Sequence, residues 1–239
     1  MCELTGTYSP LDISTNKLSA GAPDLVQSIT LPNISNAAKC TFTHNYAGLP
    51  TGVTADPSTN ELTISRSGTA IGTSSLTVTP NLSGVGPFSD KAATINIHIC
   101  KLSGGYSPSS IHTYYWPSDP SLKHEVSISL PTVNLPLKCT FTHLYSTPPA
   151  GVTIDQATHK VTVSRSAVVP STSFTITPQF DGVSDTSSMG TIAVEVIDCT
   201  PSIDLNTLTN IIAPPAGNSY AMKEAESGTV EDFEIVINQ

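Results

Sequence analysis

The stretch that decides the fold is Lys39-Cys40-Thr41-Phe42-Thr43-His44, which recurs 99 positions later as Lys138-Cys139-Thr140-Phe141-Thr142-His143. Other stretches repeat at the same offset: 28–32 with 127–131, 52–54 with 151–153, and 62–67 with 161–166. Cys100 and Cys199 share this offset, and Cys2 matches Cys100 after a slip of one residue. A repeat of this length predicts two modules of ordinary domain size, residues 1–100 and 101–199, followed by an extension, residues 200–239.

Apolar and polar residues alternate in short runs within each module. In the runs 61–66, 75–79 and 94–99, Leu, Ile and Val alternate with Thr, Ser and Asn. This period of two is typical of half-buried β-strands, and clusters of Gly, Pro, Asn and Asp separate the runs. The sequence therefore predicts an all-β protein: two tandem β-sandwich modules of about seven strands each and a C-terminal extension ending in a β-strand.

A resemblance to a known family begins at Leu49-Pro50-Thr51-Gly52-Val53-Thr54-Ala55-Asp56-Pro57-Ser58-Thr59. This stretch resembles the immunoglobulin- and cadherin-like repeat of surface proteins, which carries Leu-Pro-x-Gly-Leu-x-x-Asp-x-x-Thr-Gly before a strand. Residues 149–158 form a weaker second copy, and Asn60 and His159 stand where the family has its last glycine. The resemblance implies immunoglobulin-like sandwiches and a place at a cell surface or in an extracellular matrix, and it brings no catalytic residues.

Composition and motifs exclude several classes of protein. Charged residues make up 12% of the chain and the net charge is -9, so we expect no nucleic-acid partner, because such binders need a basic face. No apolar run reaches the roughly 18 residues that span a bilayer, so we expect no membrane insertion. The chain lacks a Gly-x-Ser-x-Gly elbow, a phosphate loop and a His-Glu-x-x-His motif. We therefore expect no enzyme and no cofactor.

Five cysteines stand at repeating positions and predict a disulfide framework; they are Cys2, Cys40, Cys100, Cys139 and Cys199. Disulfides point to an oxidising, extracellular location, either secreted or at a cell surface. One pairing that respects the repeat is Cys2–Cys40 with Cys100–Cys139, and the other is Cys40–Cys100 with Cys139–Cys199. We favour the first, because the start of the first strand and the start of the third lie at the same end of a sandwich. The fifth cysteine is then a candidate link between subunits.

Asn33 and Asn81 begin Asn-x-Ser sequons in turn-like places and are candidate N-glycosylation sites, which would make covalent glycans partners of the chain. The aromatic run 114–116, which ends in Trp116, falls in the second module only. It suits either stacking on a carbohydrate or a hydrophobic edge or contact between the modules, and we favour the second.

Metal sites are not expected. Cys40 and His44 are spaced like half of a zinc site, but residues four apart on a strand lie about 13 Å from each other. Acidic residues such as those in 181–185 are too sparse for calcium. Asp56 with Arg66 repeats as Asp155 with Arg165, which indicates a structural ion pair or a turn cap.

The last residues, 229–239, alternate again, with Phe233, Ile235 and Ile237 on one face. A lone strand with an apolar face is unstable in water, so it must pair with a sheet of its own chain or with the next copy, as in donor-strand exchange. We therefore expect an extracellular structural subunit of a head-to-tail homopolymeric fibril. The alternative is a cell-surface adhesion or glycan-binding module from a longer repeat array.

Overall fold

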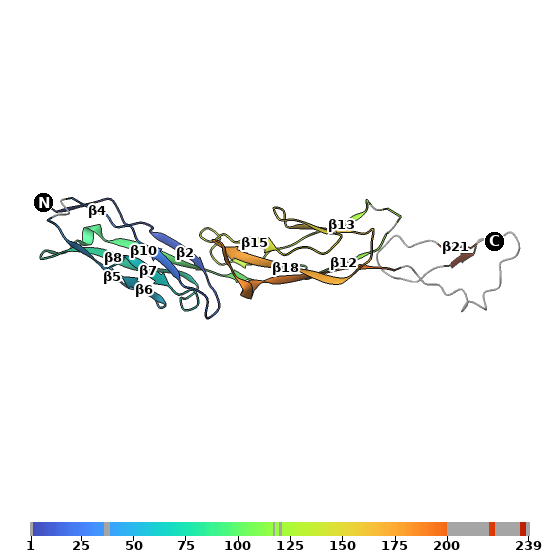
Figure 1. Ribbon diagram of the computed structural model, residues 1–239, viewed down its shortest axis with the longest axis horizontal. Helices are drawn as coiled ribbons and strands as arrows, with labels where there is room; N and C mark the ends of the chain where they lie inside the picture. Colours follow the sequence, from blue (N-terminus) through green and yellow to red (C-terminus); the bar gives the residue numbers. More distant parts are fainter. Residues whose placement is uncertain are drawn as a thin grey trace. The chain divides into compact units, whose positions relative to one another are not determined.

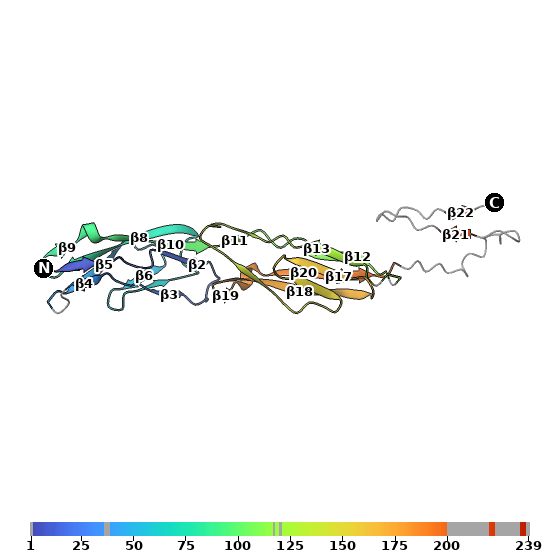
Figure 2. The same ribbon diagram turned by 90° about the horizontal axis from the view of Figure 1, so that it is seen from above.

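The computed structural model describes residues 2–35, 39–116, 118–119 and 121–199 and, beyond them, the backbone of two short strands. Residues up to Asp198 form one compact unit, and Cys199–Gln239 form a second. In the first unit the strands fall into two sets on either side of Cys100, blue to green and green to orange in Figures 1 and 2. We call residues up to Cys100 module 1 and the following residues up to Asp198 module 2.

Module 1 is built from two sheets and a short strand pair. One sheet has the order β2-β10-β8-β5, with β9 also on β8; the other has the order β3-β7-β6; and β1 pairs with β4. The elements are β1 Glu3–Thr5, β2 Asp12–Asn16, β3 Leu25–Ser28, β4 Asn33–Ser35, β5 Phe42–Ala47, β6 Val53–Asp56, β7 Glu61–Ile64, β8 Gly72–Leu82, β9 Gly86–Pro87, the 3-10 turn η1 Ser89–Lys91, and β10 Ala93–Cys100. The pairs are antiparallel except that β2 runs parallel to β10.

Module 2 repeats this plan, with sheets β12-β20-β18-β15 and β13-β17-β16, the pair β11-β14, and β12 parallel to β20. The elements are β11 Leu102–Ser103, β12 Ser110–Tyr114, β13 Lys123–Ser127, β14 Thr132–Val133, β15 Thr142–Tyr145, β16 Val152–Asp155, β17 Lys160–Ser164, β18 Val169–Phe180, β19 Val183–Ser184, the 3-10 turn η2 Thr186–Ser188, and β20 Gly190–Ile197. Each module is an immunoglobulin-like β-sandwich, as the sequence predicts.

Each module has its own core, to which both of its sheets contribute. In module 1 the buried residues are Tyr8, Ile13, Ile29, Val53, Leu62, Ile64, Leu76, Val78, Ile95, Ile97 and Ile99. In module 2 they are Tyr106, Ile111, Ile128, Val152, Val161, Val163, Phe174, Ile176, Ile192, Val194 and Val196. The alternating runs at 61–66, 75–79 and 94–99 therefore place their Leu, Ile and Val residues inside, and the prediction of half-buried strands is confirmed.

The 99-residue offset does not hold to the end of module 2. Cys100 pairs across the sheet with Asn16, but the equivalent cross-strand pair in module 2 is Ile197 with Tyr114. Ile197, not Cys199, therefore stands at the position of Cys100, and the cysteine follows two residues after the strand has ended. Shorter loops before β18 and β20 account for the shift.

Asn60 and His159 lie at equivalent turns of the two modules, one residue before strands β7 and β17. Their φ angles are 59° and 55°, in the left-handed region, where Asn and His are tolerated better than most residues. The two modules therefore share the backbone conformation of this turn.

The second unit contains two described strands. β21 (Tyr220–Met222) pairs antiparallel with β22 (Ile235–Ile237). Two of the three residues predicted to form an apolar strand face, Ile235 and Ile237, thus lie in a strand, whereas Phe233 falls outside the described residues. The part of the chain that the structure describes contains no helix long and apolar enough to cross a membrane.

Candidate functional site at the junction of the modules

One disulfide closes the start of each module. Cys2 bonds to Cys40 and Cys100 bonds to Cys139, with Cα atoms 5.8 and 5.9 Å apart. This is the pairing that the ends of the strands favour. Cys199 is exposed and makes no disulfide in the structure.

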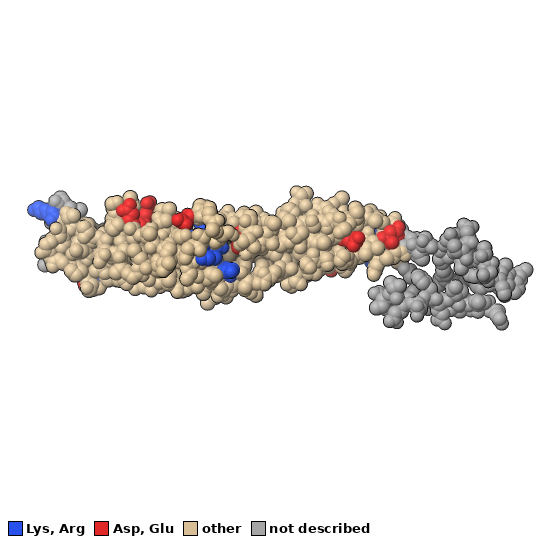
Figure 3. Space-filling model, turned by 90° about the horizontal axis from the view of Figure 1, so that it is seen from below, with Lys and Arg blue, Asp and Glu red and all other residues tan. Residues whose placement is uncertain are grey.

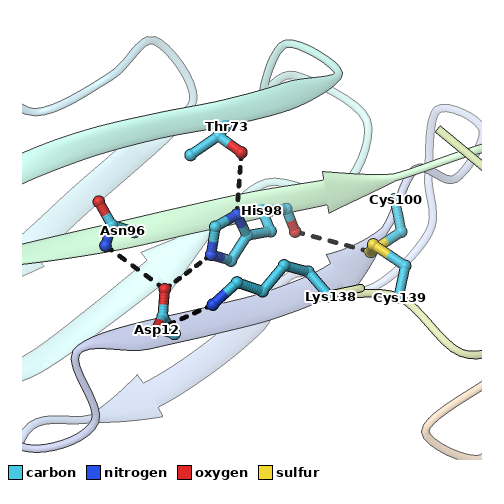
Figure 4. A network of polar contacts seen from close by, with 7 residues as sticks. All are labelled: Asp12, Thr73, Asn96, His98, Cys100, Lys138 and Cys139. Atoms are coloured by element: carbon cyan, nitrogen blue, oxygen red, sulfur yellow. Dashed lines mark hydrogen bonds and ion pairs between the residues drawn. A yellow bond between two sulfur atoms is a disulfide. The ribbon is translucent and has the colours of Figure 1, made fainter. Parts of the chain in front are cut away.

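The Cys100–Cys139 disulfide lies beside a polar network that joins residues of both modules (Figure 4). Asp12 of β2 is its centre. The His98 Nε2–H donates to Asp12 Oδ1 over 2.8 Å, and Lys138 Nζ, next to Cys139, lies 3.2 Å from Asp12 Oδ2. His98 Nδ1 lies 2.9 Å from Thr73 Oγ1, and Asn96 Nδ2 donates to Asp12 Oδ1 over 3.4 Å.

The charge on Asp12 is stabilised by these neighbours. Hydrogen bonding from His98, followed by that from Lys138, lowers the pKa of the Asp12 carboxyl. His98 projects from the outer face of its sheet but is buried, unlike most residues on such a face. The network is therefore buried at His98 but open to solvent at Asp12 and Lys138, whose side chains are 48% and 45% exposed.

Asn134 fixes the backbone at the same junction. Its Oδ1 accepts a hydrogen bond from Lys101 N–H over 2.8 Å, and its Nδ2 donates to the carbonyl of Ile99 over 3.0 Å. Ser35 does the first of these tasks in module 1, since its hydroxyl accepts from Glu3 N–H over 2.9 Å. Asn134 adds a bond to the last strand of module 1, and so holds the chain on both sides of Cys100.

A Tyr–His pair recurs inside both sandwiches. Tyr8 Oη lies 2.9 Å from His44 Nδ1, and Tyr106 Oη lies 2.9 Å from His143 Nδ1. Burial, with a smaller effect of Tyr46, raises the pKa of Tyr8 to about 12, so its phenol stays protonated and donates to the histidine. Burial lowers the pKa of His44, which keeps its imidazole neutral and able to accept.

The repeated Asp and Arg residues do not bond to each other. Asp56 accepts hydrogen bonds from Ser58 N–H and Oγ, and Asp155 accepts from Ala157 N–H, so both cap turns. Arg66 instead donates to Thr15 Oγ1 over 2.8 Å. The prediction of a turn cap is confirmed, and the alternative of an Asp–Arg ion pair is wrong.

Arg165 has a different role from Arg66. Its Nε donates to the Tyr114 carbonyl over 2.7 Å, and its guanidinium lies 5.9 Å from the centre of the Trp116 ring. Trp116 thus makes a cation–π contact within its own module, and the favoured hydrophobic edge or contact between modules stays a prediction.

The sequon asparagines lie on strands, so their predicted placement in turns is wrong. Asn33 begins β4 and Asn81 lies in β8, because each pairs with a neighbouring strand. Both side chains are exposed. Glycosylation at Asn33 and Asn81 stays a prediction.

The chemical capacity of the described surface is limited. Among the described residues no three His, Cys, Asp or Glu side chains gather to hold a metal ion. Hollows on module 2 have volumes of about 220 and 250 Å³, below the 300 Å³ or more that is usual for ligand pockets. On the face shown in Figure 3, acidic and basic side chains are sparse and separated by uncharged surface.

Sequence reasoning missed most of the junction. Asp12, His98 and Asn134 carry no motif and come together only through the strand order. The repeated Lys-Cys pair was the one available sign, because it places Lys138 beside the disulfide.

Comparisons with known proteins give distant structural likenesses only. No family model matches the chain, and no curated protein matches it. Among solved structures, Drosophila N-cadherin EC1-3 shares 12% identity at a TM-score of 0.30, over 82% of this chain and 67% of that one. Mouse cadherin-23 EC22-24 shares 12% identity at a TM-score of 0.30, over 82% of this chain and 65% of that one. Extracellular domains 3-5 of Drosophila OTK share 12% identity at a TM-score of 0.36, over 82% of this chain and 62% of that one.

The likeness is one of fold alone. The chain spans less than two thirds of the mouse cadherin-23 and OTK structures. The fold is established by the strand order and the two cores.

Proposed function

We propose that the chain is an extracellular structural protein whose copies join head to tail through the C-terminal strand. Two disulfides support an oxidising, extracellular compartment. The hollows on module 2, of about 220 and 250 Å³, are small for ligand pockets, which supports a structural or adhesive role over a catalytic one.

The strand pair β21–β22 is the observation that carries the proposal. Two three-residue strands form a two-stranded ribbon, which by itself is only marginally stable in water. The free edge of such a ribbon exposes backbone donors and acceptors that pair readily with another strand. Addition of β22 to a sheet of the next copy satisfies these groups and buries Ile235 and Ile237. Because the contact joins different surfaces of two copies, it generates filaments or rings.

Deletion of residues 223–239 tests the proposal. We expect the full chain to form polymers visible by negative-stain electron microscopy and the deleted chain to sediment as a monomer. Polymers that persist unchanged after the deletion would refute assembly through this strand.

A pair of variants separates the apolar face of the strand from its mere presence. Ile235→Ser with Ile237→Ser removes the apolar groups from one face, and we expect assembly to be lost. Val236→Ser changes the opposite face of the same strand and should leave most of the polymer intact. Equal loss in both variants would argue against an apolar docking face.

A further inference from the structure

At the end of module 1, the outer face of the sheet is covered. Asn16 and Cys100, a cross-strand pair on this face, are 0% exposed. Module 2 contributes to this cover, because Cys139 is bonded to Cys100, Phe180 packs against both cysteines, and Lys138 lies on Asp12. The cover therefore combines a disulfide, apolar contacts, a hydrogen bond from Asn134 to Ile99 and one ion pair.

The same place in module 2 is exposed in the described part of the chain. Tyr114 and Ile197, the cross-strand pair equivalent to Asn16 and Cys100, are 43% and 37% exposed. Large apolar side chains therefore stand where module 1 buries a polar residue and a half-cystine. An exposed pair of this kind at an established junction position indicates a contact surface.

The exposed patch also carries a carboxylate. Glu195 occupies the strand position of His98, with its side chain 37% exposed and its Oε2 3.3 Å from His112 Nδ1. The patch therefore offers an acidic group close to where Asp12 meets Lys138 in module 1. We define the terminal patch as Tyr114, Glu195 and Ile197.

A second copy of the covering segment exists at the start of module 1. Lys39–Cys40 repeats Lys138–Cys139 in sequence, and the Cys2–Cys40 disulfide holds it as Cys100–Cys139 holds its counterpart. Lys39 is exposed and makes no ion pair in the part of the chain that the structure describes, whereas Lys138 is engaged with Asp12.

We infer that the terminal patch binds the Lys39–Cys40 segment of a second copy of the chain, with Lys39 on Glu195. The contact rests on the head-to-tail assembly proposed above and names its second surface. It reproduces the internal junction without the disulfide, because Cys40 is already bonded to Cys2. The aliphatic part of the Lys39 side chain packs on Tyr114 and Ile197, because Cys40 is itself buried.

Charge reversal in the full-length chain tests the contact. Lys39→Glu and Glu195→Lys each place like charges together, and each should raise the protein concentration needed for assembly by at least about threefold. An equimolar mixture of the two variants should assemble like the original chain, because every junction then brings opposite charges together. Sedimentation velocity at low salt measures both effects. Asp24→Lys, which reverses an exposed charge elsewhere, should assemble normally.

The outcomes separate this contact from the strand proposal. If the charge variants assemble normally and deletion of residues 223–239 abolishes assembly, the contact at the terminal patch is refuted and assembly through the C-terminal strand is retained. If mixing rescues the impaired charge variants and the deleted chain assembles normally, assembly through the C-terminal strand is refuted and the contact at the terminal patch is retained. Impaired variants that mixing does not rescue overturn the patch as a site for a second copy, as expected if residues 200–239 of the same chain cover it. A chain that stays monomeric overturns both proposals.

Discussion

Tyr46 and Tyr145 occupy the same position in the two modules but differ in their partners. Tyr145 Oη lies 2.8 Å from His159 Nδ1. In module 1, Tyr46 Oη and Asn60 Oδ1 are buried, and neither makes a hydrogen bond within the described residues. A buried polar group without a hydrogen-bond partner costs free energy. Asn60, which stands where module 2 has His159, therefore leaves the hydrogen-bonding groups of module 1 less well satisfied at this turn.

Asn60→His should therefore stabilise module 1. Histidine tolerates the left-handed φ at this turn, as His159 does, and its ring nitrogen can accept from Tyr46. We expect a gain of about 1 kcal/mol in the free energy of unfolding, or a rise of about 4 °C in the melting temperature of this module. Thermal unfolding monitored by circular dichroism measures it. In a Tyr46→Phe background the gain should vanish, and a gain that persists there would contradict the hydrogen bond as its cause.

At the scale of elements, the disulfides hold the smallest sheets in place. β11 and β14 are two residues each and lie inside the segment that Cys100–Cys139 closes. Strands this short contribute few ladder hydrogen bonds, so the covalent link carries much of the stability of this end of module 2.

Replacement of Cys100 and Cys139 by Ala should destabilise module 2. The link closes a loop with a sequence separation of 39 residues, for which chain entropy predicts a loss of about 4 kcal/mol. Urea unfolding followed by intrinsic fluorescence of Trp116 reports on this module. Cys199→Ala, which removes the exposed thiol, should leave the midpoint unchanged; an equal loss in both variants would show that the effect is not due to the disulfide.

At the scale of the whole molecule, buried histidines and capped carboxyls set the response to pH. Burial lowers the pKa of His44 and, together with His159, that of His143. The unfolded chain therefore binds protons more readily than the folded one between the folded pKa and about 6.5. Hydrogen bonds lower the pKa of Asp12, Asp56 and Asp155 in the folded chain. Protonation of these carboxyls at lower pH therefore causes a second loss of stability.

We expect stability to be level above about pH 6.5, to fall as the pH drops below that value, and to fall again below about pH 4. Urea midpoints measured between pH 3 and pH 8 test this. Replacing both His44 and His143 by Gln should flatten the upper step and leave the lower one. An upper step that survives the double replacement would assign it to other groups.

The strands were predictable because their physics is local. Alternating Leu62 and Ile64, or Ile95 and Ile97, fix which face enters a core, and the 99-residue repeat showed that the plan occurs twice. The ends of strands also favoured one disulfide pairing, since cysteines at opposite ends of a sandwich cannot meet.

The junction was not predictable, because it depends on contacts between residues far apart in the chain. Lys138 meets Asp12 only after β2 has paired with β10 and the disulfide has set Cys139 beside Cys100. Arg66 was paired with the wrong partner for the same reason, since Thr15 lies in β2, which belongs to the other sheet of the sandwich from β7. The shift that moves Cys199 away from the position of Cys100 came from shorter loops in module 2. The alternation of apolar and polar residues along strands does not predict loop lengths.

The two disulfides also set how the chain would carry a mechanical load. Tension that reaches Cys100 along β10 passes through the sulfur bridge to Cys139 and bypasses the residues between them, and the Cys2–Cys40 bridge does the same in module 1. The bridged segments, with sequence separations of 38 and 39 residues, cannot lengthen under force. Each bridge therefore withholds about 130 Å of extensible length until it is reduced, so a reducing agent would change the chain from a short tether into a long one.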